Sequence, residues 1–85
     1  FIEIFIATEG QQQFALTKGQ YKTIEMTMVY IQGIAIDPTI DFVLVDDEFK
    51  NKIYINEPLP AGTEVKVHVL QTLPIQSDSS GLIIP

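Results

Sequence analysis

The side chains of this sequence that could support catalysis or metal binding are a single histidine and a scatter of carboxylates. His68 has no second histidine and no cysteine to join it, so a zinc site or a histidine-based acid–base pair would lack its partners. His68 shares one face of an alternating run with Glu64 and Lys66. This pattern predicts a residue on the surface of a sheet.

Carboxylates are densest at Asp46-Asp47-Glu48, with Asp37 and Asp41 upstream. Such oxygen ligands suit calcium, but they lack the Asp-x-Asp-x-Asp-Gly order of a dedicated calcium loop. Two carboxylates about 5–10 Å apart in a cleft would suit glycoside hydrolysis, yet a domain of 85 residues has little cleft. Aspartates also favour turns, because their side chains bond their own backbone. We therefore expect no enzymatic activity, no cofactor and no metal, with calcium at this turn as the open alternative.

Composition limits the partners of the chain. Its 85 residues make one domain, and an apolar content of 46% is typical of globular proteins. The formal net charge is −6 and there is no arginine, so we expect neither nucleic acid nor an anionic membrane surface as a partner. No apolar run reaches the roughly 18–20 residues of a membrane span. A small domain without disulfides can gain stability from oligomerisation.

Alternation of apolar and polar residues predicts an all-β chain of six to seven short strands without significant helix. The expected strands cover residues 2–8, 12–16, 24–32, 34–36, 41–46, 52–56 and 63–72. Residues 27–45 form the expected central strand pair, with a turn at Gln32-Gly33 and a break at Asp37-Pro38. The proline-rich segment 58–62 is expected to bend rather than to lie in a central strand. This spacing predicts an antiparallel sandwich or a small barrel.

The same alternation assigns a face to each side chain. In the first strand the core positions are expected to be Ile2, Ile4 and Ile6, with Glu3, Phe5 and Ala7 outside. In the strand 24–32 the core positions are expected to be Thr27, Val29 and Ile31, with Met26, Met28 and Tyr30 outside. Methionine adapts to contact surfaces and tyrosine is enriched at interfaces. We therefore predict a subunit interface at Phe5, Met26, Met28 and Tyr30, with burial under the chain's own loops as the alternative.

The two ends of the chain suggest a segment of a longer polypeptide. The sequence starts at Phe1 rather than at methionine and lacks the layout of a signal peptide. Near the other end, Ser77-Asp78-Ser79-Ser80-Gly81 is typical of a linker. We expect a sandwich module over residues 1–73, followed by a linker or the start of another segment over residues 74–85.

Several short motifs follow one another in a characteristic order. They are Ala7-Thr8-Glu9-Gly10-Gln11-Gln12-Gln13-Phe14-Ala15-Leu16, Val29-Tyr30-Ile31-Gln32-Gly33, Asp41-Phe42, Ile53-Tyr54-Ile55, Leu59-Pro60-Ala61-Gly62 and Thr63-Glu64-Val65-Lys66-Val67. The ordered set resembles a small β-module that recurs in tail-fibre, baseplate and head-fibre proteins of tailed bacteriophages. The resemblance covers about residues 2–72. It departs from the pattern at Gln32, where asparagine is usual, and in the loop after Leu16, which carries two lysines.

The resemblance implies an immunoglobulin-like sandwich in an extracellular virion appendage, often as a homotrimer, and no enzymatic activity. We therefore expect a structural module with its ends on opposite sides, which connects segments and packs against other subunits and other virion proteins. One alternative is a receptor- or carbohydrate-binding module of the same kind of particle, contacting a host surface glycan. Another is an adhesion or linker domain of a bacterial surface protein. Glycan binding would favour aromatic side chains at loop tips, where Tyr21 is the single candidate tyrosine.

Overall fold

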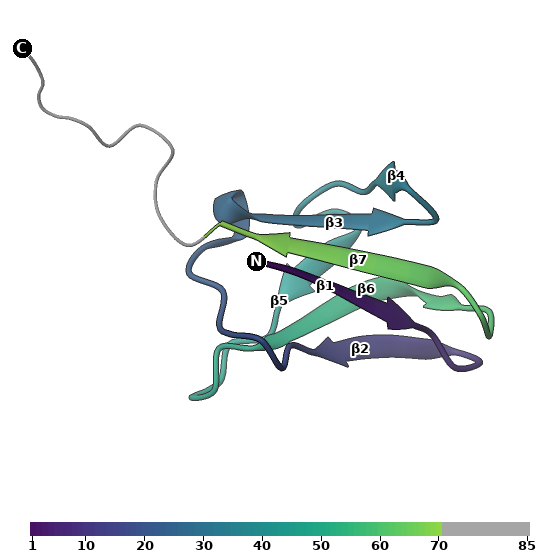
Figure 1. Cartoon of the computed structure of the whole chain (residues 1–85), viewed down its shortest axis with the longest axis horizontal. Coiled ribbons are helices and arrows are strands. Elements are labelled where there is room, and N and C mark those ends of the chain that lie inside the picture. Colours follow the sequence, from purple (N-terminus) through teal and green to yellow (C-terminus); the bar gives the residue numbers. More distant parts are fainter. Residues whose placement is uncertain (71–85) are drawn as a thin grey trace, which may run out of the picture.

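Two antiparallel β-sheets pack face to face in this protein (Figure 1). The computed structural model describes residues 1–70. The four-stranded sheet has the order β1 (Ile2–Ile6), β7 (Glu64–Val69), β3 (Thr27–Ile31) and β4 (Ile34–Ala35). The three-stranded sheet has the order β2 (Gln11–Ala15), β6 (Lys52–Leu59) and β5 (Phe42–Leu44). The predicted all-β antiparallel sandwich is confirmed.

Helical structure within residues 1–70 is limited to one 3-10 turn, η1 (Ile24–Met26). It replaces the first part of the predicted strand 24–32, so β3 has five residues and β6, with eight, is the longest strand. The expected module boundary at residue 73 and the linker 74–85 lie outside the described residues.

The core lies between the two sheets. Its largest fully buried apolar side chains are Phe14, Phe42, Ile53, Ile55, Val29, Val65, Val67 and Val69. Burying such a side chain stabilises the fold by about 1.5–3 kcal/mol. Thr27 and Val29 are buried and Ile31 packs against the core, so the predicted inward face of β3 is confirmed.

The predicted faces of β1 are inverted. Ile2, Ile4 and Ile6 are 44%, 55% and 63% exposed, whereas Glu3 and Ala7 are buried. The ring of Phe5 also turns inward, with its centre 5.4 Å from that of Phe14 in the opposite sheet. Alternation alone does not say which face is buried, and here an aromatic contact between the sheets decides it. The placement of Phe5 on the outside was therefore wrong.

Residues 27–45 do not form the expected central pair. They divide between the sheets, because β3 pairs with β7 and β4, while β5 pairs with β6. The predicted turn at Gln32-Gly33 is present, with φ angles of 51° and 82°. Two successive positive φ angles in a two-residue loop give the twist that a tight hairpin needs. This turn joins β3 to the short β4, so the chain has a hairpin here but no long strand after it.

The expected bend at residues 58–62 was wrong in part, since β6 runs through Pro58 to Leu59 and is the central strand of its sheet. The ladder between β2 and β6 shifts register between Gln11, opposite Leu59, and Gln13, opposite Tyr54. Pro58 falls within this bulge, where no ladder hydrogen bond requires its missing N–H. The side chain of Gln12 spans the bulge and donates from Nε2 to the carbonyls of Ile55 and Asn56, at 3.1 and 3.0 Å.

Residue 1 and the end of β7 lie side by side. The Phe1 nitrogen donates to the Val69 carbonyl at 2.7 Å, and the Val69 N–H donates to the Phe1 carbonyl at 2.8 Å. Because β1 and β7 are antiparallel neighbours, β1 begins where β7 ends. The expectation of ends on opposite sides of the sandwich was therefore wrong.

Candidate functional site

Met28 and Tyr30 of the predicted interface lie on the solvent-facing side of the four-stranded sheet, which we call the outer face. β1 contributes Ile2, Ile4 and Ile6, β7 contributes Glu64, Lys66 and His68, and β3 contributes Met28 and Tyr30. The strand register sets these residues in rows, such as Ile4, Lys66 and Tyr30. The outer face therefore has apolar side chains on both flanks of a polar central strand.

Two of the four predicted interface residues lie together on this face. Met28 and Tyr30 are half-buried, with the Tyr30 hydroxyl 3.8 Å from the Met28 sulfur. The Lys66 ammonium lies 4.9 Å from the centre of the Tyr30 ring, a cation–π contact. Met26 is instead buried at the end of η1, and Phe5 is in the core.

The isoleucine stripe of Ile2, Ile4 and Ile6 is the part of the outer face that the sequence analysis missed. Three β-branched residues in alternation predicted a core face, because that is where such residues usually lie. The one signal against it was Phe5, whose larger ring competes for the same interior. Phe5 and the isoleucine stripe lie on opposite faces of β1, so only one of the two can face the core.

His68 lies on the outer face, in a row between Ile2 and Met28, as the alternation predicted. No group of three His, Cys, Asp or Glu side chains within residues 1–70 is arranged to hold a metal ion. Within the same residues, no helix is long and apolar enough to span a membrane.

The acidic turn after β5 uses its carboxylates to hold its own shape. Asp46 pairs with Lys50 at 2.8 Å, and Asp47 pairs with Lys52 at 2.8 Å. Asp47 also accepts hydrogen bonds from the N–H groups of Phe49 and Lys50, at 2.9 and 3.2 Å. The hydrogen bond from Lys52 is the main reason that the pKa of Asp47 lies below its usual range. These bonds stabilise a turn in which Lys50 has a positive φ of 53°.

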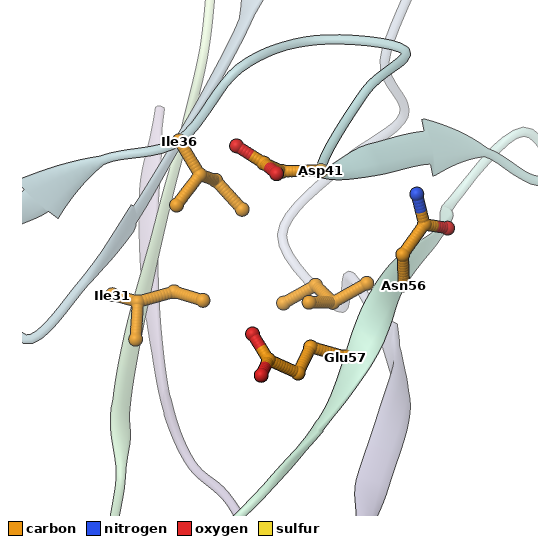
Figure 2. A pocket seen from close by; sticks show the side chains of 6 residues that line it. Ile31, Ile36, Asp41, Asn56 and Glu57 are labelled. Carbon is orange, nitrogen blue, oxygen red and sulfur yellow. The ribbon is translucent and has the colours of Figure 1, made fainter.

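A cavity of about 240 Å³ opens between the sheets, below the roughly 300–1,000 Å³ of sites for drug-sized ligands. Its lining consists of Ile31, Ile36, Asp41, Ile55, Asn56 and Glu57. Figure 2 shows the carboxyl groups of Asp41 and Glu57 on different sides of the cavity, with Ile31 and Ile36 along a third side. The Asp41 carboxylate accepts a hydrogen bond from the Asp37 N–H at 2.9 Å. The cavity offers mainly acceptors and apolar walls.

The aromatic residue at a loop tip is Phe49, not Tyr21. Tyr21 is buried, donates its hydroxyl to the Val45 carbonyl, and has a pKa raised mainly by that burial. Phe49 is 56% exposed, and the Lys52 ammonium lies 4.5 Å from its ring centre. Its exposure could not be predicted from the sequence, because Phe49 stands among charged residues without periodicity.

Comparison of the sequence with protein-family models and with curated proteins gives no match. A functional assignment therefore depends on the ordered motifs of the sequence and on the geometry described above.

Proposed function

We propose that this chain is a non-enzymatic, immunoglobulin-like structural module of a tailed-phage appendage, such as a tail fibre, baseplate or head fibre. The proposal is supported chiefly by the positions of the motif residues within the fold. Phe14, Leu16 and Phe42 are buried in the core, and Gln32-Gly33 forms the tight turn of the β3–β4 hairpin. These motif residues thus occupy core and turn positions, as the proposed module requires.

The module works through contacts between surfaces. The outer face presents apolar side chains beside a polar strand, which suits packing against other subunits and other virion proteins. The net charge of −6 favours the solubility of unassembled chains. No reacting group is required for this role.

The position of the ends refines the proposal. Because Phe1 pairs with Val69, a chain that enters at residue 1 leaves β7 at the same end of the sandwich. The opposite end carries the turns that follow β1 and β3, where the Gln32 N–H donates to the Glu64 carbonyl at 3.0 Å. We infer a module that stands out sideways from the appendage, with these turns at its free end.

Immunogold labelling tests the proposed location. Antibodies raised against this chain should decorate the appendages of tailed particles purified from the source, and pre-incubation with the purified chain should abolish the label. Label confined to the bacterial envelope would contradict the proposal and would support an adhesion or linker domain.

One observation favours the alternative of a receptor- or carbohydrate-binding module. Phe49 is 56% exposed at the tip of a turn, and the Lys52 ammonium lies over one face of its ring, so stacking of a sugar would have to use the other face. On a glycan array this alternative requires a signal that Phe49→Ala abolishes. A silent array would leave the structural module as the better proposal.

A further inference from the structure

Four strands lie at the edges of the two sheets, and they differ in how well they are protected against pairing with another chain. β4 has two residues and β5 has three, which are too short to template a long pairing. β2 follows a regular register with β6 only from Gln13 to Ala15, because residues 55–58 of β6 form a bulge opposite Gln12. β1 has five residues with no bulge and no proline, and one edge of it has no neighbouring strand within residues 1–70.

The free edge of β1 carries both backbone hydrogen-bonding groups and apolar side chains. Toward β7 the bonds come from odd-numbered residues. Phe1 exchanges hydrogen bonds with Val69, and the Ala7 N–H donates to the Thr63 carbonyl. Along an antiparallel strand the bonding direction alternates, so the N–H and C=O groups of Ile2, Ile4 and Ile6 point to the free edge. Among the described residues one side chain reaches this edge, where the Lys18 ammonium donates to the Ile2 carbonyl at 3.2 Å.

Such an edge selects an extended strand as its partner. Backbone groups in a row require the complementary row of another strand, and the exposed isoleucines require apolar side chains on the same face. A helical partner would leave the row of backbone groups unpaired, and a charged strand would place charges against the exposed isoleucines.

We propose that β1 pairs antiparallel with β1 of a second copy of this chain, about a two-fold axis at Ile4. In this register Ile4 faces Ile4 of the second copy, and Ile2 faces Ile6, so the two paired β1 strands present only isoleucines on the outer face. Glu3 faces Phe5 of the second copy, so no like charges meet. The Glu3 carboxylate is already bound to Thr17 and Lys18 and does not compete for the edge.

The pairing joins the four-stranded sheets of the two copies into one continuous sheet. It is isologous and closes at two chains, unlike the trimer that the family resemblance implies. A contact along one short strand buries less than the roughly 1,200 Å² of a standard stable interface, so we expect reversible, concentration-dependent association. This inference does not rest on the proposed function.

Sedimentation of the whole chain over a series of concentrations tests the pairing. The wild-type mass should rise toward twice that of one chain. Ile4→Lys places two ammonium groups opposite each other at the axis and should keep the mass at one chain. Ile34→Lys makes the same change at an isoleucine that is 70% exposed on β4, and should associate as the wild type does.

A cross-linking experiment gives an independent test that does not need Ile4→Lys to fold. The chain has no cysteine, so Ile4→Cys carries the sole thiol. Across the axis the two Cα atoms would be about 5.5 Å apart, within reach of a short bis-maleimide. Ile4→Cys should yield a covalent two-chain product at least about tenfold faster than Ile34→Cys. A tenfold ratio corresponds to about 1.4 kcal/mol in the free energy of bringing the two thiols together.

Four results would overturn the pairing. The first two are a one-chain mass of the wild type at every concentration and a three-chain mass. The third is equal cross-linking rates for Ile4→Cys and Ile34→Cys, and the fourth is two-chain association that survives Ile4→Lys. None of these results bears on immunogold labelling, so the two proposals can fail separately.

Discussion

Glu3 places a carboxylate inside the sandwich, where an unpaired charge would be costly. Its oxygens accept hydrogen bonds from the Thr17 N–H at 2.8 Å, the Thr17 hydroxyl at 2.7 Å and the Lys18 N–H at 3.1 Å. These bonds tie the loop after β2 to β1. Glu3→Gln replaces an acceptor by an amide whose NH2 group faces donors, so we expect the free energy of unfolding to fall by about 1–3 kcal/mol at pH 7.

Urea unfolding measures this change, with Glu48→Gln as the control because it removes the same charge at an exposed position. The control should change the free energy of unfolding by less than about 0.5 kcal/mol. Equal losses in the two variants would mean that net charge, and not the bonds to Glu3, determines the effect.

The stability of the fold should also depend on pH through Glu3. Burial raises the pKa of Glu3, but the bonds from Thr17 and Lys18 and the charge of Lys18 together outweigh it, so the pKa lies below its ordinary value. The resulting stabilisation is present above the pKa of the unfolded chain, about 4.3, and is lost as the pH falls through the lower pKa of the folded chain. The stability difference between the wild type and Glu3→Gln should therefore shrink below about pH 4. A difference that is constant from pH 7 to pH 3 would contradict this assignment.

At the scale of secondary structure, the bulge between β2 and β6 depends on one amide. Gln12 Nε2 lies within 3.1 Å of the Ile55 and Asn56 carbonyls and of the Tyr54 hydroxyl. Its two N–H groups are shared among these three acceptors, and Gln12→Leu leaves the acceptors to water or unpaired. We expect a loss of about 1 kcal/mol in the free energy of unfolding, the usual contribution of such a hydrogen bond. Gln13→Leu, at the exposed neighbouring position, should stay within about 0.5 kcal/mol of the wild type. Thermal or urea unfolding of both variants measures the difference. A loss for Gln13→Leu as large as that for Gln12→Leu would contradict the role assigned to the Gln12 amide.

The positions of the strands could be predicted from the sequence, but the buried face of β1 and the course of β6 could not. Alternation located strands in all seven places, because the two-residue period of a strand is a local property. It did not determine which face of β1 is buried, because that depends on Phe14 in the other sheet and on donors in the loop after β2. It also did not show that Pro58 lies in a central strand, since only the register shift opposite Gln12 makes room for it.

The candidate contact surface was predictable to a similar degree. Met28 and Tyr30 were found because both faces of their strand are apolar and one face had to lie outside. The isoleucine stripe was not found, because the exposed face of an edge strand is decided by the rest of the sandwich. Phe49 was missed for the same reason, since its exposure depends on how Asp47 folds the turn back toward Lys52.

At the scale of the whole molecule, the two flanks of the outer face make different predictions. The isoleucine flank borders the proposed pairing edge, whereas Met28 and Tyr30 lie two strands away, across β7. If the flank formed by Met28 and Tyr30 packs against other virion proteins, Met28→Asp would bury a carboxylate in that contact and weaken it. We expect about a tenfold or greater loss of incorporation into particles, equivalent to about 1.4 kcal/mol or more. Quantitative immunoblotting of purified particles measures the loss.

The matched control is Val43→Asp, which makes the same type of change on the outside of the three-stranded sheet, where Val43 is 37% exposed. It should be incorporated as well as the wild type, because the proposed contact lies on the opposite sheet. Met28→Asp should also keep the two-chain association in solution, since Met28 lies away from the β1 edge. Equal incorporation of the Met28→Asp and Val43→Asp variants would remove Met28 from the contact and leave the isoleucine stripe as the one apolar flank with a proposed role.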